Sequence, residues 1–118
     1  MEWCKDIDDW PQSWAGDEDD VLMGLKLLTE FKRYLINLIA KRRSKTTIKK
    51  HADYLWCLGG EIIRDTSEYG DKEKLSNKDV VLRYVDSSGG PYWRHALSES
   101  DEHHYHSVCR QLYKFLTQ

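Results

Sequence analysis

The sequence predicts a single all-α domain, a small bundle of four main helices with an N-terminal arm. Apolar residues recur at spacings of three and four, and Ser or Asp stands where helices should begin. No run alternates at period two for long enough to predict a confident strand. A length of 118 residues suits one domain, and 40% hydrophobic residues are enough for a packed core.

The arm comprises residues 1–16, and the helical domain comprises residues 17–118. Helical periodicity is poor in the arm, but three tryptophans, Trp3, Trp10 and Trp14, lie in it. Because large aromatic side chains favour buried or interfacial positions, we expect the arm to pack on the body or on a partner. Trp10 and Pro11 are expected to form a turn.

The first long helix is expected over residues 18–42. Asp17 can cap its N-terminus, and the acidic residues 18–20 complement the positive end of its dipole. Its apolar stripe runs from Val21 to Ile39 at spacings of three and four.

The second long helix is expected over residues 45–67, with Ser44 as its N-cap. The two apolar stripes need to bury each other, and the connection between the helices is short. We therefore expect an antiparallel hairpin that turns at Arg43–Ser44. Gly59 and Gly60 fall in mid-helix, where each costs about 1 kcal/mol relative to alanine. We therefore expect a close helix crossing or a kink at this point.

Two shorter helices should follow. The third is expected over residues 77–86 after a Ser76 cap, although Val80–Val85 is also a run that could form a short strand. The fourth is expected over residues 99–117 after a Ser98 cap.

A basic corner, residues 41–50, joins the two long helices and contains six basic residues. Such a cluster at a helix–helix turn is typical of helical domains that bind a phosphate backbone. The alternative is a helix C-terminus followed by solvated lysines, with no ligand. The expected phosphate ligands are Arg42, Arg43, Lys45, Lys49 and Lys50, with a hydroxyl contact from Thr46 or Thr47.

The charge of the chain is unevenly distributed. Residues 1–20 contain eight acids and one base, whereas the rest of the chain contains 17 bases and 12 acids. The acidic segment either folds back over the basic corner, binds a basic partner, or is simply solvated. Trp3, Trp10 and Trp14, together with Trp56, would then serve as anchors for a protein partner or for self-association.

Three short patterns lie in the two long helices and the corner between them: Phe31-x-x-Tyr34-Leu35, Ser44-Lys45-x-Thr47-Ile48 and His51-x-x-x-Leu55. Together they make residues 25–63 resemble the first helical hairpin of the core-binding domain of tyrosine recombinases, a SAM-like bundle that grips DNA. In that family a Ser-x-x-Thr corner opens a helix with basic and aromatic residues. The family's catalytic domain and its His-x-x-Arg are absent, so the resemblance implies a helical DNA-binding module without recombinase activity.

The residues that come nearest to the ligand pattern of a metal site are His103, His106 and Cys109, because residues three apart share one face of a helix. No Cys-x-x-Cys or His-Glu-x-x-His spacing accompanies them, and Cys109 falls on an apolar stripe. We therefore expect a core cysteine, no metal and no cofactor. No cysteine has an evident base with an orienting group, so an enzyme is not expected.

The sequence thus predicts a small non-enzymatic binding module, with nucleic acid as the leading ligand and a protein partner or self-association as the alternative. Three widely spaced cysteines favour a reduced, cytoplasmic setting over a disulfide framework. No apolar run approaches the about 20 residues that span a bilayer, and the first residues do not resemble a signal peptide.

Overall fold

Helices make up the architecture, as the sequence predicts. The computed structural model describes residues 4–69 and 75–118, so Trp3 lies outside the described residues. Within these ranges there is no strand, and only an isolated bridge joins Asp86 to Gly89. The elements are η1 (Ile7–Asp9), α1 (Trp10–Trp14), α2 (Glu18–Ala40), α3 (Lys45–Tyr69), α4 (Asn77–Leu82) and α5 (Glu99–Leu116). The all-α prediction is therefore confirmed.

The four main helices begin where the capping residues predict. In each case the cap side chain accepts a hydrogen bond from the backbone N–H three residues later, which satisfies a donor that the helix cannot use internally. These bonds are Asp17 to Asp20 (3.0 Å), Ser44 to Thr47 (3.1 Å), Ser76 to Asp79 (3.1 Å) and Ser98 to Asp101 (3.0 Å).

All four predicted helix ends shift: α3 runs two residues further, to Tyr69, and α5 stops one residue earlier, at Leu116, while α2 and α4 are shorter than predicted. α2 stops at Ala40 because the next residues form a tight C-terminal turn, and α4 stops at Leu82 rather than at residue 86. Beyond Leu82 the chain leaves the helix and buries Val85 in the core. The Asp86–Gly89 bridge then closes a small turn.

The expected turn at Trp10 and Pro11 is wrong. Both residues open the short helix α1, where the proline stands in the first turn and so removes no intrahelical hydrogen bond. Trp10 is only 3% exposed, so its indole belongs to the core. A proline after a tryptophan therefore marks a helix start at this point of the chain.

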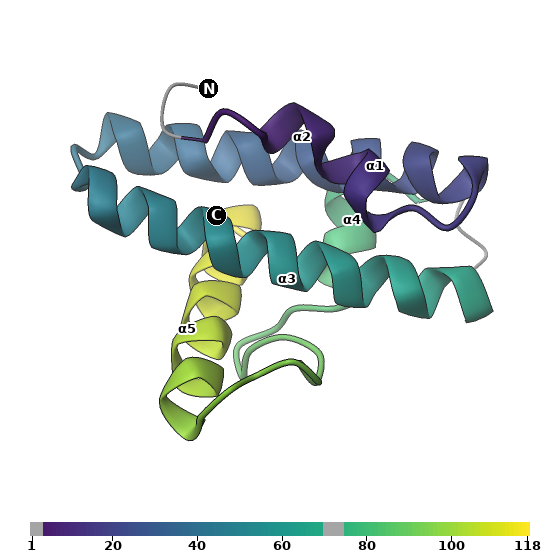
Figure 1. Cartoon of the computed structure of the whole chain (residues 1–118). Coiled ribbons are helices and arrows are strands. Elements are labelled where there is room, and N and C mark those ends of the chain that lie inside the picture. The colour runs from purple at the N-terminus through teal and green to yellow at the C-terminus, as the bar shows by residue number, and fades with distance from the viewer. Residues whose placement is uncertain (1–3, 70–74) are drawn as a thin grey trace.

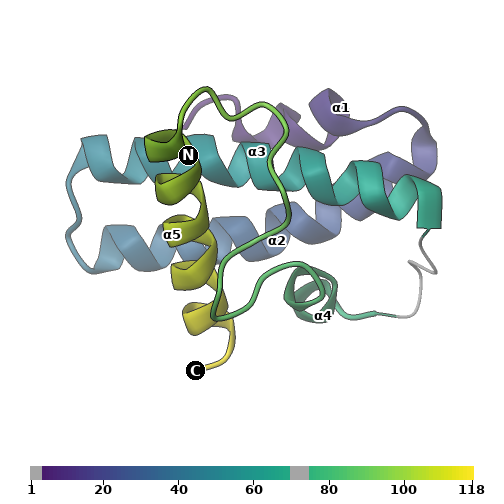
Figure 2. The same ribbon diagram turned by 90° about the horizontal axis from the view of Figure 1, so that it is seen from below.

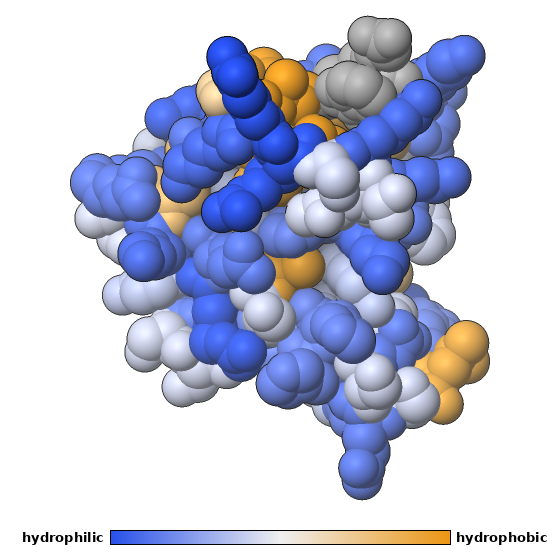
Figure 3. All heavy atoms as spheres, turned by 90° about the vertical axis from the view of Figure 1, so that its left-hand side faces the viewer, coloured by the Kyte–Doolittle hydropathy of each residue, from blue (hydrophilic) through white to orange (hydrophobic). Residues whose placement is uncertain are grey.

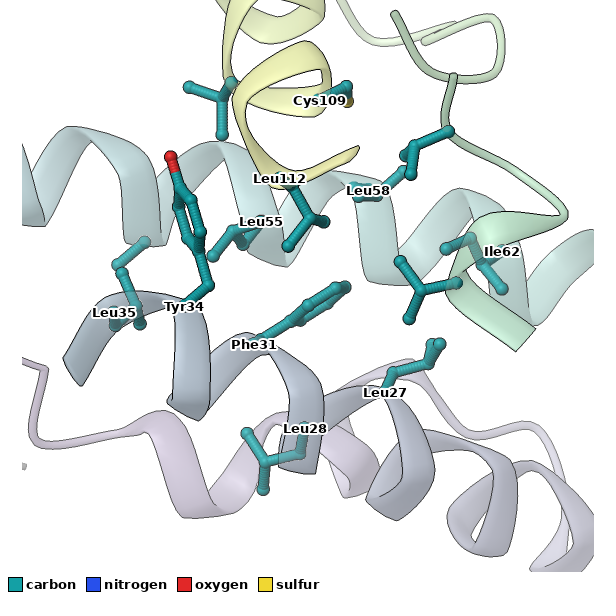
Figure 4. Packing of buried hydrophobic residues seen from close by; sticks show 14 of the residues in the cluster. Leu27, Leu28, Phe31, Tyr34, Leu35, Leu55, Leu58, Ile62, Cys109 and Leu112 are labelled. Atoms are coloured by element: carbon teal, nitrogen blue, oxygen red, sulfur yellow. The ribbon is translucent and has the colours of Figure 1, made fainter. Parts of the chain in front are cut away.

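α2 and α3 form the antiparallel hairpin that the sequence predicts, and it is the middle layer of the molecule (Figure 1). α1 lies on one side of the hairpin, while α4 and α5 lie on the other, with α5 crossing the hairpin steeply (Figure 2). The buried stripes meet between the layers: Leu27, Phe31 and Leu35 of α2, Leu55, Leu58 and Ile62 of α3, and Leu112 of α5 (Figure 4). None of the helices in the described ranges has the length and apolar character needed to cross a bilayer.

Two glycines let α1 approach the hairpin. A Cβ on Gly24 would lie 2.9 Å from the Cα of Pro11, and a Cβ on Gly59 would lie 2.2 Å from Cζ2 of Trp14. The sequence predicts a close helix crossing or a kink at Gly59, whereas the close contact there is made by the indole of Trp14. α3 continues through both glycines as one helix.

Replacing Gly59 with alanine should destabilise the fold by roughly 1–3 kcal/mol, because the new methyl group overlaps the Trp14 ring. Gly60→Ala is the matched control, since a Cβ there would meet Trp14 at an ordinary 3.7 Å. That change should stabilise the protein by up to about 1 kcal/mol through helix propensity. Urea denaturation of both variants measures the free energy of unfolding. Equal changes at the two positions would contradict the packing of the Trp14 ring against Gly59.

Candidate nucleic-acid interface

The basic corner begins with a defined helix C-terminus. The backbone N–H of Arg42 donates to the carbonyl of Ile39 at 2.9 Å, and that of Arg43 donates to the carbonyl of Leu38 at 3.1 Å. This pair of bonds is a Schellman motif, in which the residue after the cap adopts a left-handed conformation. Arg42 has that conformation, with φ of 59°. The backbone of the turn is therefore fixed, and with it the origin of both arginine side chains.

The second half of the corner is the first turn of α3. Ser44 caps the helix and also donates from its hydroxyl to Thr47 Oγ1 at 2.9 Å. Ile48 is buried and anchors this turn in the core. Thr47 is half-buried, while Lys45, Lys49 and Lys50 are exposed, as are Arg42 and Arg43. The corner thus presents its cations to solvent, and hydrophilic side chains cover most of that end of the molecule (Figure 3).

Arg42 holds a backbone conformation that favours glycine. A left-handed conformation costs a residue with a Cβ roughly 1–2 kcal/mol. Among the described residues other than glycine, only Arg42 has a positive φ. Such strain at an exposed turn is a reason to look for a role of the side chain.

Arg42→Gly should leave the free energy of unfolding unchanged or raise it by up to about 1 kcal/mol, because relief of strain opposes the greater freedom of glycine in the unfolded chain. Arg43→Gly makes the same charge change without a positive φ to relieve, so it should destabilise. Chemical denaturation compares the two variants. A loss of stability in Arg42→Gly equal to that in Arg43→Gly would show that the left-handed conformation of Arg42 carries no strain.

A buried polar pair lies behind the corner. The hydroxyl of Tyr34 and Nδ1 of His51 share a hydrogen bond of 2.9 Å, and their rings are stacked. Phe115 of α5 packs edge-on against Tyr34. Burial lowers the pKa of His51, and the nearby charge of Arg43 lowers it further. Burial raises the pKa of Tyr34, so both side chains are neutral at pH 7.

The lowered pKa of His51 makes folding sensitive to acid. The unfolded histidine has a pKa near 6.5, so below this value the unfolded chain binds the proton more readily than the folded one. The stabilising contribution is therefore present above the unfolded pKa and is lost as the pH falls toward the folded pKa. Unfolding by urea at about pH 7.5 and 5.5 should show a larger loss for wild type than for His51→Gln, which keeps a hydrogen-bonding group beside Tyr34. Equal losses would show that His51 does not resist protonation.

The described part of the arm runs away from the corner. Asp8 forms an ion pair with Lys32 in the middle of α2, which lowers the pKa of the Asp8 carboxyl. From there the arm leads to Trp14, whose ring covers Gly59 in the second half of α3. α1 consequently lies toward the end of the hairpin that is opposite the corner (Figure 1).

The tryptophans of the arm take part in internal packing. Trp10 is buried, and the indole N–H of Trp14 donates to the backbone carbonyl of Trp56 at 3.0 Å. Trp56 is 44% exposed and donates to Ser13 Oγ at 3.0 Å. Trp14, Trp56 and Trp93 line a cavity of about 640 Å³ between the arm and α3. The proposed role of Trp3, Trp10 and Trp14 in partner binding stays a prediction.

The His-rich start of α5 has a structural use. His106 Nδ1 accepts a hydrogen bond of 3.1 Å from the backbone N–H of Gly90, and the Cys109 thiol lies against the same glycine. Burial raises the pKa of Cys109 to about 12, which disfavours a reactive thiolate. His103 is exposed. No group of three or more His, Cys, Asp or Glu side chains in the described ranges is arranged to hold a metal ion.

A groove of about 440 Å³ continues from the corner along the crossing of α3 and α5. Thr47 and Lys50 belong both to the corner and to the lining of the groove. Tyr54 donates to Asp101 Oδ1 at 3.0 Å and lies edge-on to Trp93, with 5.9 Å between ring centroids. Sequence reasoning missed this groove because its two walls are about half the chain apart. The available signal was the spacing of Lys50 and Tyr54, which share one face of a helix.

Comparison of the chain with protein-family models, curated proteins and solved structures finds no match. The resemblance to the recombinase core-binding domain therefore stays a prediction.

Proposed function

We propose that this protein is a non-enzymatic nucleic-acid-binding module whose basic corner, residues 41–50, binds phosphates. The observation that carries the proposal is the exposed cluster of cations on a turn that two helix ends hold in place. A rigid backbone lowers the entropy that the protein must lose when these side chains engage a ligand.

Helix electrostatics separate this proposal from the ligand-free alternative. Cations at a helix C-terminus are favourable, so the end of α2 alone accounts for Lys41, Arg42 and Arg43. The same rule gives no reason for a cation at Lys45, which stands in the first turn of α3. Positive charge at a helix N-terminus adds to the exposed N–H groups and makes the place attractive to phosphate.

The resemblance of residues 25–63 to a DNA-gripping helical hairpin also favours the basic corner as the binding site. The corner that opens the second helix in that family corresponds here to Ser44 and Thr47. In this chain the Ser44 hydroxyl caps α3 and donates to Thr47 Oγ1, and Thr47 also lines the groove.

The alternative is a protein partner or self-association through the arm. The cavity lined by Trp14, Trp56 and Trp93 favours it, because aromatic side chains around a hollow are common anchors in protein interfaces. The experiment below separates the two functions.

The triple variant Arg42→Glu, Arg43→Glu and Lys45→Glu should bind nucleic acid much more weakly than wild type while remaining folded. Wild-type affinity should fall steeply between about 50 and 200 mM salt, because each neutralised phosphate releases counterions. In the variant, the slope of log K against log salt should become shallower by about three. Fluorescence anisotropy with labelled oligonucleotides measures both quantities, and circular dichroism checks the fold.

The matched control is Lys78→Glu, Arg83→Glu and Lys114→Glu, which changes the net charge equally at exposed sites outside the corner. It should retain most of the wild-type affinity. If both triple variants lose affinity equally, binding depends on overall charge and the corner has no special role. If wild type binds no oligonucleotide even at low salt, the proposal fails and the tryptophan-lined cavity becomes the leading site.

A further inference from the structure

The groove between α3 and α5 opens beside the basic corner. Its volume of about 440 Å³ lies within the range of about 300–1,000 Å³ typical of small-ligand sites. Lys50 and Thr47 mark the end nearest the corner. A ligand held by the cations of the corner can therefore extend into the groove without crossing other elements.

The floor and the rim of the groove differ in chemistry. Trp93 is almost fully buried and Tyr54 is half-buried beside it, so two aromatic rings belong to the lining, together with the buried side chains of His51 and Val108. His104 and Gln111 of α5 lie on the groove, and both are exposed. This combination is suited to a flat apolar group with polar edges, because its face can stack on rings while its edge forms hydrogen bonds.

Charge determines which part of a nucleotide can enter. Asp53 and Asp101 line the groove, so a phosphate would meet two carboxylates there. Lys50 is the one corner cation in the lining of the groove, and the other cations of the corner do not line it. Phosphates are therefore favoured at the corner, and a neutral base is favoured in the groove.

We propose that the groove receives an unpaired nucleobase, so that the ligand of this protein is single-stranded DNA or RNA. This inference rests on the proposed function, since it assigns the strand state of the nucleic acid bound at the corner. A base within a duplex is stacked and paired, and removing it from the stack has an energetic cost that a single strand does not bear. Stacking on aromatic rings tolerates any base, so little sequence preference is expected from the groove.

The experiment compares single-stranded DNA, single-stranded RNA and a DNA duplex of the same sequence, using anisotropy at one salt concentration. Both single strands should bind more tightly than the duplex. Tyr54→Ala should weaken single-strand binding by about fivefold or more, whereas the salt slope should stay unchanged because no phosphate contact is lost. Tyr54→Phe is the control, since it keeps the ring and removes only the hydrogen bond to Asp101. It should retain single-strand binding.

Chemical-shift mapping supplies a readout that needs no variant. A single strand should shift the amide signals of Tyr54 and His104 and the indole signal of Trp93, whereas the duplex should shift the corner alone. Duplex binding as tight as single-strand binding, or shifts confined to residues 41–50, would overturn the groove inference and leave the proposed function standing. Equal losses in Tyr54→Ala and Tyr54→Phe would likewise overturn it. Absence of binding to all three oligonucleotides would overturn the proposed function itself.

Discussion

Burial of two long apolar stripes against each other holds α2 and α3 antiparallel, and the hairpin they form determines where every other element lies. Each large apolar side chain that leaves water contributes about 1.5–3 kcal/mol, so the stripes dominate the folding free energy. A pair of helices leaves two faces of its stripes uncovered. Trp10 and Trp14 of α1 cover one face, while Val80 of α4 and Leu112 of α5 cover the other. The glycine at position 59 is explained by this arrangement, because it admits an indole where any side chain would collide.

The same constraint exposes the basic corner. A short connection between two long helices has to lie at the end of the molecule, where backbone polar groups can be satisfied by caps and by water. The corner is nevertheless attached to the core, because Ile48 is buried within it and the buried pair of Tyr34 and His51 lies behind it. Phe115 extends that packing to α5, which forms one wall of the groove. The cationic surface and the groove therefore share one rigid support.

Local signals predicted the fold well. A cap such as Ser98 acts within its own first turn, and an apolar stripe is a property of one helix, so both can be read without knowing the rest of the chain. The helix opened by Trp10 was missed because Trp-Pro is also a turn signal, and only burial of the indole decides between the two. Gly59 indicated a close contact but could not name Trp14, which is distant in sequence. The groove was beyond prediction for the same reason, since it exists only where α5 crosses α3.

Acidic residues lie at the start of α2 and the basic corner lies beyond its end, and this separation affects how a polyanion would approach the protein. α2 has 23 residues, so the acids at its start and the corner beyond its end are roughly 33 Å apart. The Debye length at physiological ionic strength is about 8 Å, so charges at one end are largely screened from the other. A net charge of −2 therefore does not describe the potential at the corner, where six basic residues are clustered. The acidic end repels a polyanion while the corner attracts it, so the molecule would be oriented with residues 41–50 toward the strand before contact is made.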